Sequence, residues 1–309
     1  MASTPGATPA AAGSATGTSP DAPAAAAPEV EIPAEQATGV GPVHSIAFGE
    51  KKRAAMGATG VWLDAGAGWS AMPPIGVDTT GSRIFFGRDD QPRVVGANGD
   101  TFVYMRFRLG VWKKGDEEIA GLAANPRSPL YAVLGHADPE VVCKRGGGCI
   151  IKRRSGWTLF EAPQTTGIPQ VELCGEQPWA FDGPVIWKVV NAGFTPHGSA
   201  PSFAKADGLW ALGDSDIWVV EASANKVHHW DGKAWQAAPS PIRGPRSVWA
   251  SGPRDVWIAG AGGAGHYDGE RWRRVTGVRE GMVTVNGRSK DEVWLGGEAG
   301  LFRLQPPAK

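Results

Sequence analysis

The 309-residue sequence has no excess of charge of either sign and no long apolar run. Its 31 lysines and arginines equal its 31 aspartates and glutamates, so no net field draws the chain toward nucleic acid or anionic lipid. No apolar run approaches the roughly 18 to 20 residues that cross a bilayer, which predicts that no membrane span is present. The N-terminus also lacks a basic region followed by an apolar stretch, the pattern of a signal peptide.

Cysteine is scarce, with three in the chain, and no paired histidines lie near them, which excludes a zinc site. Cys143 and Cys149 lie in VVCKRGGGCII, where two β-branched runs flank a glycine-rich turn. This pattern predicts a hairpin that could set the two sulfurs opposite each other, and a disulfide there would fit an oxidising compartment. Two reduced thiols in a cytoplasmic protein are the alternative. Cys174 would be unpaired and buried in a strand.

Glycine, proline and tryptophan are abundant instead, with 44, 25 and 14 residues. Many turns that join aromatic-rich strands produce such a composition, and long helices do not. Residues 1–27 are almost entirely Ala, Ser, Thr, Gly and Pro, which predicts a disordered linker. A linker of this kind could tether a domain at the cell surface or in an extracytoplasmic compartment, behind a secretion signal or lipidated cysteine upstream; a plain disordered tail is the alternative.

A repeat runs along the rest of the chain. Short strand-like runs that end in glycine recur 35 to 48 residues apart, and we count seven of them. Their closing residues are Gly49, Gly87, Gly135, Gly175, Gly213, Gly252 and Gly287. The clearest units hold four short strands separated by turns, with no room for a helix. This pattern predicts an all-β, seven-bladed β-propeller of four-stranded antiparallel blades over residues 28–304, with a C-terminal tail at 305–309. Six or eight blades remain alternatives.

The two ends of the predicted propeller suggest how it closes. The last unit stops after three strands, at Gly300 to Leu304, and a spare strand-like piece, PEVEIP, spans Pro28 to Pro33. We expect this piece to supply the missing fourth strand of the last blade, which would protect the exposed sheet edges. The expected product is a monomeric ring.

The stretch VWASGPRDVWIAGAGGAGHYDGERW, which ends at Trp272, resembles the Trp-rich propeller repeats of bacterial surface and secreted proteins of the myxobacterial type. It is similar in layout to tectonin repeats and, more loosely, to the Asp-box repeats of sialidase-type propellers. The resemblance is strong over Leu209 to Leu304 and diffuse over Ser45 to Pro196. It implies an architecture and a function in binding sugars, surface glycans or proteins, rather than catalysis.

Two Asp-Gly pairs, Asp231-Gly232 and Asp268-Gly269, occupy the same place in adjacent units. Asp-Gly favours tight hairpin turns, so we interpret both as structural corners. Trp235 and Trp272 follow each aspartate by four residues and are expected to pack the last strand against the next blade. One carboxylate per corner makes a poor calcium site.

Other motifs carry little chemistry. GAGGAG, Gly260 to Gly265, matches a dinucleotide fingerprint, but HYDGERW follows it where a helix would have to begin. His229 and His266 hold equivalent positions in adjacent blades and are too far apart to share a metal. We therefore predict no catalytic residues, no metal and no cofactor. The basic pieces Lys51 to Arg53 and Ile151 to Arg154 are predicted to be exposed edges rather than nucleic-acid contacts.

The ligand face is predicted at the loops between blades and between second and third strands, because propellers commonly bind there. These loops and the nearby aromatics supply the candidate ligand-binding residues Arg243, Arg246, Arg279, Glu280, Asn225, Lys226, Trp210 and Trp249. The expected partner is a glycan or a protein. A propeller hydrolase or lyase acting on polysaccharide, and a scaffold subunit of an envelope complex, are the alternatives.

Overall fold

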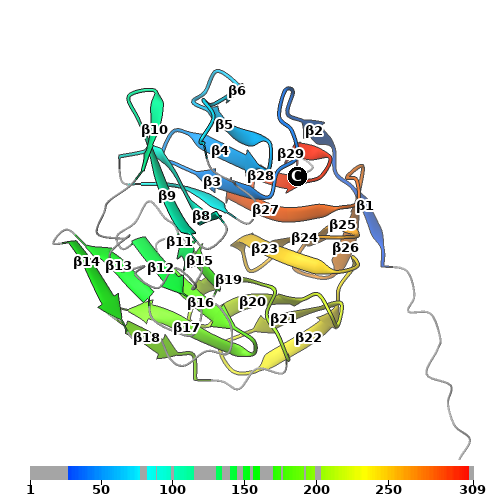
Figure 1. Cartoon of the computed structure of the whole chain (residues 1–309). Coiled ribbons are helices and arrows are strands. Elements are labelled where there is room, and N and C mark those ends of the chain that lie inside the picture. The colour runs from blue at the N-terminus through cyan, green and yellow to red at the C-terminus, as the bar shows by residue number, and fades with distance from the viewer. Residues whose placement is uncertain are drawn as a thin grey trace, which may run out of the picture.

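A computed structural model describes most of the chain from residue 27 onward (Figure 1). The described residues are 27–76, 82–87, 89–98, 101–114, 130–133, 140–144, 149–153, 156–160, 170–174, 177–190, 193–198 and 203–305. The predicted linker, apart from residue 27, and residues 306–309 of the predicted tail lie outside them. Within these ranges every regular element is a strand, and none of them holds a helix long and apolar enough to cross a membrane.

The described strands form seven sheets, and the first four are antiparallel meanders. The first sheet holds β3 (Ser45–Phe48), β4 (Arg53–Gly57), β5 (Gly60–Asp64) and β6 (Trp69–Ala71). The second holds β7 (Arg83–Phe86), β8 (Pro92–Asn98), β9 (Thr101–Arg108) and β10 (Val111–Lys114). The third holds β11 (Leu130–Val133), β12 (Glu140–Lys144), β13 (Cys149–Arg153) and β14 (Gly156–Phe160), and the fourth holds β15 (Gln170–Cys174), β16 (Gln177–Asp182), β17 (Val185–Val190) and β18 (Gly193–Pro196).

The fifth sheet is also an antiparallel meander, and the last two sheets each add a strand from the N-terminal part of the described chain. The fifth holds β19 (Gly208–Gly213), β20 (Asp216–Glu221), β21 (Lys226–Trp230) and β22 (Trp235–Pro239). The sixth holds β23 (Pro245–Gly252), β24 (Asp255–Gly260), β25 (Gly263–Tyr267) and β26 (Trp272–Thr276), with β1 (Glu29–Glu31) beside β26. The seventh holds β27 (Met282–Ser289), β28 (Glu292–Gly297) and β29 (Gly300–Leu304), with β2 (Ala34–Gln36) beside β29.

The sheets are arranged around a central axis as in a β-propeller (Figure 1). The first strand of each sheet is innermost and contacts the first strand of the next sheet, and β27 contacts β3. Because each sheet is a meander, the turns that follow its first and third strands lie on one face of the molecule. We call this face, which carries the Asp-Gly corners, the corner face.

The predicted fold is wrong in its strand composition and in the strand expected to close it. The sixth sheet has five strands, because β1 pairs with β26 in parallel: Val30 lies opposite Val275. The predicted closing piece, Pro28 to Pro33, therefore adds to the sixth sheet rather than to the last. It is β2 that pairs with β29, where Ala34 lies opposite Leu304. The sequence signal missed this arrangement because AEQ in β2 has no apolar or β-branched pattern.

The core between sheets is apolar and rich in tryptophan. Trp257 is fully buried with Val293 and Leu295 between the sixth and seventh sheets, and Trp179 is buried with Phe181 between the fourth and fifth. Such aromatic burial contributes about 1.5–3 kcal/mol or more for each side chain, which lets short strands form stable sheets.

The outer tryptophans pack against the preceding sheet, and the expectation that they contact the next one is wrong. Trp272 lies 6.0 Å from Trp218 of the fifth sheet, ring centre to ring centre. The strand register explains this direction. Trp272 lies opposite Tyr267, which lies opposite Val256, so the three side chains share one sheet face. Val256 is buried against the fifth sheet, and the tryptophan follows it there.

The cysteines lie where the hairpin pattern places them. Cys143 of β12 and Cys149 of β13 are opposite each other in the register, but their side chains, and with them the predicted disulfide, lie outside the described part. Cys174 is free and buried, as predicted, and burial raises the pKa of its thiol far above the usual range. Its Sγ accepts a hydrogen bond from the Ala211 amide at 3.1 Å.

Candidate ligand-binding site

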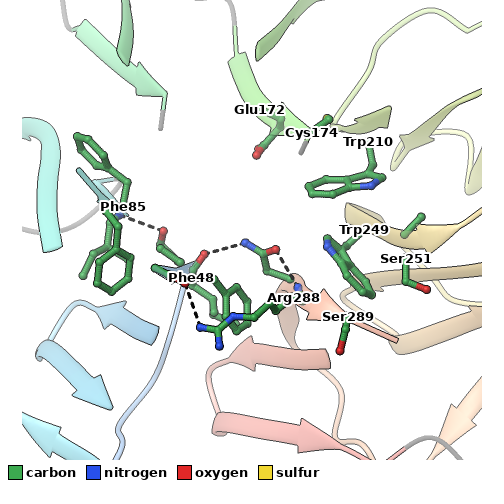
Figure 2. A pocket seen from close by; sticks show the side chains of 18 of the residues that line it. Phe48, Phe85, Glu172, Cys174, Trp210, Trp249, Ser251, Arg288 and Ser289 are labelled. Carbon is green, nitrogen blue, oxygen red and sulfur yellow. Dashed lines mark hydrogen bonds between the residues drawn. The ribbon is translucent and has the colours of Figure 1, made fainter. Parts of the chain in front are cut away.

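A cavity of about 870 Å³ lies between the inner strands, around the central axis. Inner strands of the first, second, fourth, fifth, sixth and seventh sheets contribute residues to its wall. It extends toward the corner face, where the inner strands end, because Leu212, Ser251, Ser289 and Lys290 are among its lining residues. Figure 2 shows side chains from several inner strands turned toward it. We call this hollow the main chamber.

Four side chains occupy one level of the main chamber. Each lies directly opposite a tryptophan of the second strand in its own sheet, and this shared register places them at the same height. The four are Glu172 opposite Trp179, Trp210 opposite Trp218, Trp249 opposite Trp257 and Asn286 opposite Trp294. Because they come from four consecutive sheets, they form a continuous arc around the axis, which we call the binding arc.

The centre of the binding arc is aromatic. The rings of Trp210 and Trp249 lie 6.1 Å apart with an interplanar angle of 53°, and Trp249 is almost fully buried. The buried Nε1 of Trp210 has no hydrogen-bond partner in the described structure. Phe48 and Phe85 lie on the other side of the chamber in Figure 2. An aromatic wall of this kind suits the apolar part of a ligand.

An ion pair crosses the cavity beside the arc. Arg83 Nη1 of β7 lies 2.5 Å from Glu172 Oε1 of β15, although these strands belong to the second and fourth sheets. The two side chains are 38% and 31% exposed, so the pair is in contact with solvent. Both residues also line a smaller chamber of about 260 Å³, together with His44, Asp207 and Arg246. The pair therefore lies where the two chambers meet.

The Asn286 end of the binding arc, together with Arg288 beside it, is held by fixed hydrogen bonds. Asn286 Nδ2 donates to the Ile46 carbonyl at 3.0 Å, and its Oδ1 accepts from the Gly287 amide at 2.8 Å. Arg288 Nη2 donates to the Gly49 and Lys52 carbonyls at 3.1 and 2.9 Å. These side chains join the seventh sheet to the first and have fewer groups left for a ligand than the Trp210 side.

The structure separates the eight residues predicted to bind ligand. Trp210 and Trp249 line the main chamber, and Trp210 and Arg246 line the smaller one. The other five line neither chamber: Arg243, Arg279, Glu280, Asn225 and Lys226. Arg243 and Glu280 form an exposed ion pair of 3.7 Å, and Asn225 Oδ1 accepts from the Gly244 amide at 2.7 Å. These loops lie on the face opposite the corner face.

Sequence reasoning missed Arg83, Glu172, Phe48, Phe85 and Arg288. One signal was present: VELCG places a carboxylate, Glu172, where the later units LWALG and VWASG place Trp210 and Trp249. A charge at an otherwise aromatic position of an inner strand indicates a change in the lining of the axis. The partner Arg83 could not be found this way, because the ion pair joins sheets that are not neighbours.

At the Asp-Gly corners the aspartates bind the backbone of their own turns. Asp231 Oδ1 accepts from the Lys233 and Ala234 amides, both at 2.9 Å, and Gly232 has a φ of 87°. The amide bonds, Ala234 first, hold the pKa of Asp231 below its usual range. Asp268 Oδ1 accepts from the Glu270 and Arg271 amides at 3.0 Å, with a φ of 92° at Gly269. These carboxylates are occupied by the turns.

The two repeated histidines are bound within their own sheets. His229 Nε2 lies 2.9 Å from Asp216 and its ring stacks on Trp218 at 3.8 Å. His266 Nε2 lies 2.8 Å from Asp255, and its ring stacks on Trp257 at 4.0 Å.

Asp255 is an acceptor for three side chains. Burial raises its pKa, but hydrogen bonds from His266, Ser251 and Trp257 outweigh burial and lower it. Among the described residues, no group of three or more histidine, cysteine, aspartate or glutamate side chains could hold a metal ion.

Comparison with known proteins shows the fold. No protein-family model matches the chain, and no curated protein matches it. Among solved structures it is similar to YCF48 bound to D1 peptide, with 15% identity, 91% of this chain and 100% of that chain covered, and a TM-score of 0.66. It is also similar to a catalytically inactive virginiamycin B lyase from Staphylococcus aureus with quinupristin, with 14% identity, 90% and 99% covered, and a TM-score of 0.66. The WD40 β-propeller domain of Doa1 matches at 9% identity, 89% and 96% covered, and a TM-score of 0.64.

These likenesses establish an all-β propeller fold. The tectonin-like, Trp-rich repeat type is a narrower classification, and none of the neighbours tests it. At such low identities they carry no activity over to this chain.

Proposed function

We propose that this propeller is a binding module that takes a segment of a protein partner into the main chamber from the corner face. The observation that carries the proposal is the binding arc: two tryptophans between a carboxylate and an amide, at one level of a cavity of about 870 Å³. Ligand sites are concave, mostly apolar and supplied with a few placed polar groups, and the arc has this composition.

A peptide suits the arc better than a glycan. The described wall combines Trp210, Trp249, Phe48 and Phe85 with both signs of charge, which matches the mixture of side chains in a protein segment. One structural neighbour is described as bound to a peptide, which supports this class of partner for the fold. Glycan binding, and a scaffold role in an envelope complex, are outcomes that the experiment below distinguishes.

A lyase is the second candidate, because the fold is shared with virginiamycin B lyase. The described histidines are placed differently from a general base at the main chamber. His229 and His266 are paired with aspartates inside their sheets, His228 is buried beside Glu221, and His44 lines the smaller chamber. The placement of these groups favours binding over proton transfer.

The proposal can be tested by a substitution that blocks the entrance of the main chamber. Ser251 and Ser289 are exposed where the inner strands end, so Ser251→Trp would fill the entrance, with the loss of the hydrogen bond that Ser251 donates to Asp255. Ser223→Trp is the matched control, since Ser223 is exposed in the turn between β20 and β21 on the opposite face. Binding would be measured on a peptide array and a glycan array with wild-type protein and both variants.

We expect the wild type and Ser223→Trp to bind the same peptides on the array, and Ser251→Trp to lose this binding. Peptide binding that survives the block, or binding of glycans alone, would contradict the proposal. Turnover of quinupristin by the wild type, lost in Ser251→Trp, would favour the lyase.

A further inference from the structure

We infer that the main chamber recognises a cationic side chain, the ammonium of lysine or the guanidinium of arginine, between Glu172 and Trp210, and that Arg83 fills this position when no ligand is bound. This inference rests on the proposed function and names the chemical group that the chamber selects. In this arrangement the Arg83–Glu172 ion pair keeps the ligand position occupied until a ligand cation replaces Arg83.

The position has the two parts that a cation site needs. Glu172 and Trp210 occupy the same level of neighbouring inner strands, β15 and β19, which contact each other. Figure 2 shows the Glu172 carboxylate and the Trp210 ring on the same side of the chamber. A carboxylate binds an ammonium or guanidinium by charge-assisted hydrogen bonds. The face of a tryptophan attracts the same cations.

Arg83 already satisfies the carboxylate from across the axis. Its Nη1 lies 2.5 Å from Glu172 Oε1, and it reaches there from β7, past the sheet that lies between them. No other cation is paired with Glu172 in the described structure. The guanidinium therefore stands in the place where a ligand cation would bind, as an internal substitute for it.

The pair is weak enough to exchange. Both side chains are about a third exposed, and ion pairs with such access to water contribute little to stability. A ligand cation that also covers the Trp210 ring gains an apolar and aromatic contact in addition to the ion pair. Because Arg83 lines both chambers, its displacement would also widen the passage between them.

The sign of the ligand charge follows from the aromatic wall. An anionic group that displaced Glu172 from Arg83 would leave that carboxylate unpaired and would meet the negative face of the tryptophan ring. A cation that displaces Arg83 keeps the Glu172 carboxylate paired and lies against the attractive face of the ring. The arrangement thus favours a cation over an anion.

The experiment uses the whole chain and blocked amino acids as probes. N-acetyl-lysine amide and N-acetyl-arginine amide are the cationic probes, with N-acetyl-glutamate amide and N-acetyl-glutamine amide as charge controls. Binding would be followed by the NMR shift of the Trp210 indole N–H, assigned with Trp210→Phe. The variants are Glu172→Gln, which removes the charge and keeps the shape, and Arg83→Met, which removes the internal cation.

We expect the cationic probes to bind the wild type and to lose about tenfold or more in affinity with Glu172→Gln. Arg83→Met should bind them up to about fivefold more tightly, because the competing group is gone. Glutamine and glutamate probes should bind weakly in all three proteins. If the ion pair were merely structural, Glu172→Gln and Arg83→Met should act alike: both should weaken probe binding, or neither should change it.

Two results would overturn the inference. Preference for the glutamate probe with loss in Arg83→Met would show an anion site, and the proposed binding function would survive. Peptide signals blocked by Ser251→Trp, together with no response of the Trp210 indole to any probe, would also leave the proposed function in place without a cation site. Loss of the proposed function itself would appear separately, as array signals unaffected by Ser251→Trp.

Discussion

Arg53 of the first sheet contacts Glu292 of the seventh, 239 residues away in sequence. The same guanidinium donates to Asp64 Oδ2 from Nε at 2.9 Å and from Nη2 at 2.6 Å, and it lies 4.9 Å from the centre of the Trp294 ring. Burial lowers the pKa of Arg53, but the bonds to Asp64 and Glu292 outweigh it and raise the pKa. The prediction that this basic piece is an exposed edge is therefore wrong at Arg53.

Replacing Arg53 should destabilise the junction of the first and last sheets. Asp64 is 2% exposed, so Arg53→Met would leave its carboxylate with only the Gly66 and Gly68 amides as partners. We expect a loss of about 2–3 kcal/mol in the free energy of unfolding, measured by urea denaturation. Lys290→Met is the control: its pair with Asp291 is exposed on both sides and should change stability by less than about 0.5 kcal/mol. Equal losses in the two variants would contradict this account.

The histidine stacked on Trp257, His266, should be replaceable by a cationic side chain. Four sheets place Lys188, His229, His266 and Arg303 opposite a tryptophan of the second strand. His266→Arg should therefore unfold within about 1 kcal/mol of the wild type. His266→Glu should cost about 2 kcal/mol more than His266→Arg, because it places a carboxylate beside Asp255. Thermal unfolding of the two variants side by side gives the comparison, and equal midpoints would rule out the electrostatic reason.

Much of the fold could be predicted from the sequence because strands and turns are local. The glycine-ended runs and the Asp-Gly corners specify four-stranded units without reference to distant residues. The strands β1 and β2 could not be assigned this way. Their three residues carry no clear period, and their partners lie about 240 to 270 residues away, so only the assembled sheets decide the pairing. The direction in which the outer tryptophans pack depends on register in the same way.

Gly57 should not tolerate a methyl group. A Cβ at this position would lie 1.6 Å from the carbonyl oxygen of Pro42, which is backbone and cannot move aside cheaply. Gly57→Ala should destabilise the protein by about 2–4 kcal/mol. At Gly252 nothing lies within 4 Å of the added carbon, so Gly252→Ala should change stability by less than about 1 kcal/mol. Chemical denaturation of both variants tests the difference, and similar midpoints would disprove the steric reason.

His228 should make stability depend on pH between 7 and 5. Its side chain is 1% exposed, and burial lowers its pKa more than Glu221, 3.1 Å from Nε2, raises it; nearby Lys226 lowers it further. Because the folded pKa lies below the unfolded value near 6.5, the unfolded chain binds more protons, and stability falls as the pH drops below about 6.5.

His228→Gln removes the titrating group while keeping a hydrogen-bonding side chain beside Glu221. The free energy of unfolding should then fall less steeply between pH 7 and 5, by up to about 1.4 kcal/mol per pH unit. Denaturation curves at several pH values give the slope, which does not depend on any constant loss caused by the substitution. Parallel slopes in wild type and variant would exclude His228 as the cause.

The candidate site was predictable only in part, for a reason of geometry. Trp210 and Trp249 could be predicted because both occupy the second position of a glycine-ended run, LWALG and VWASG, in two adjacent repeats. The Arg83–Glu172 pair crosses between sheets whose strands are not hydrogen bonded to each other. No periodicity along one strand reports such a contact. The loops around Arg243 and Glu280 were predicted to bind ligand because they are rich in charge. The main chamber extends instead toward the corner face, on the opposite side of the molecule.

The pairing of β1 with β26 and of β2 with β29 constrains the order in which the molecule can assemble. These two strands are made early on the ribosome, yet their partners are among the last strands to emerge. They must remain unpaired while the first five sheets take shape, and the last two sheets cannot be completed until the chain has been made as far as β29. Contacts of such long sequence separation slow folding. The last folding step is thus the one that pairs β1 and β2 with their distant partners.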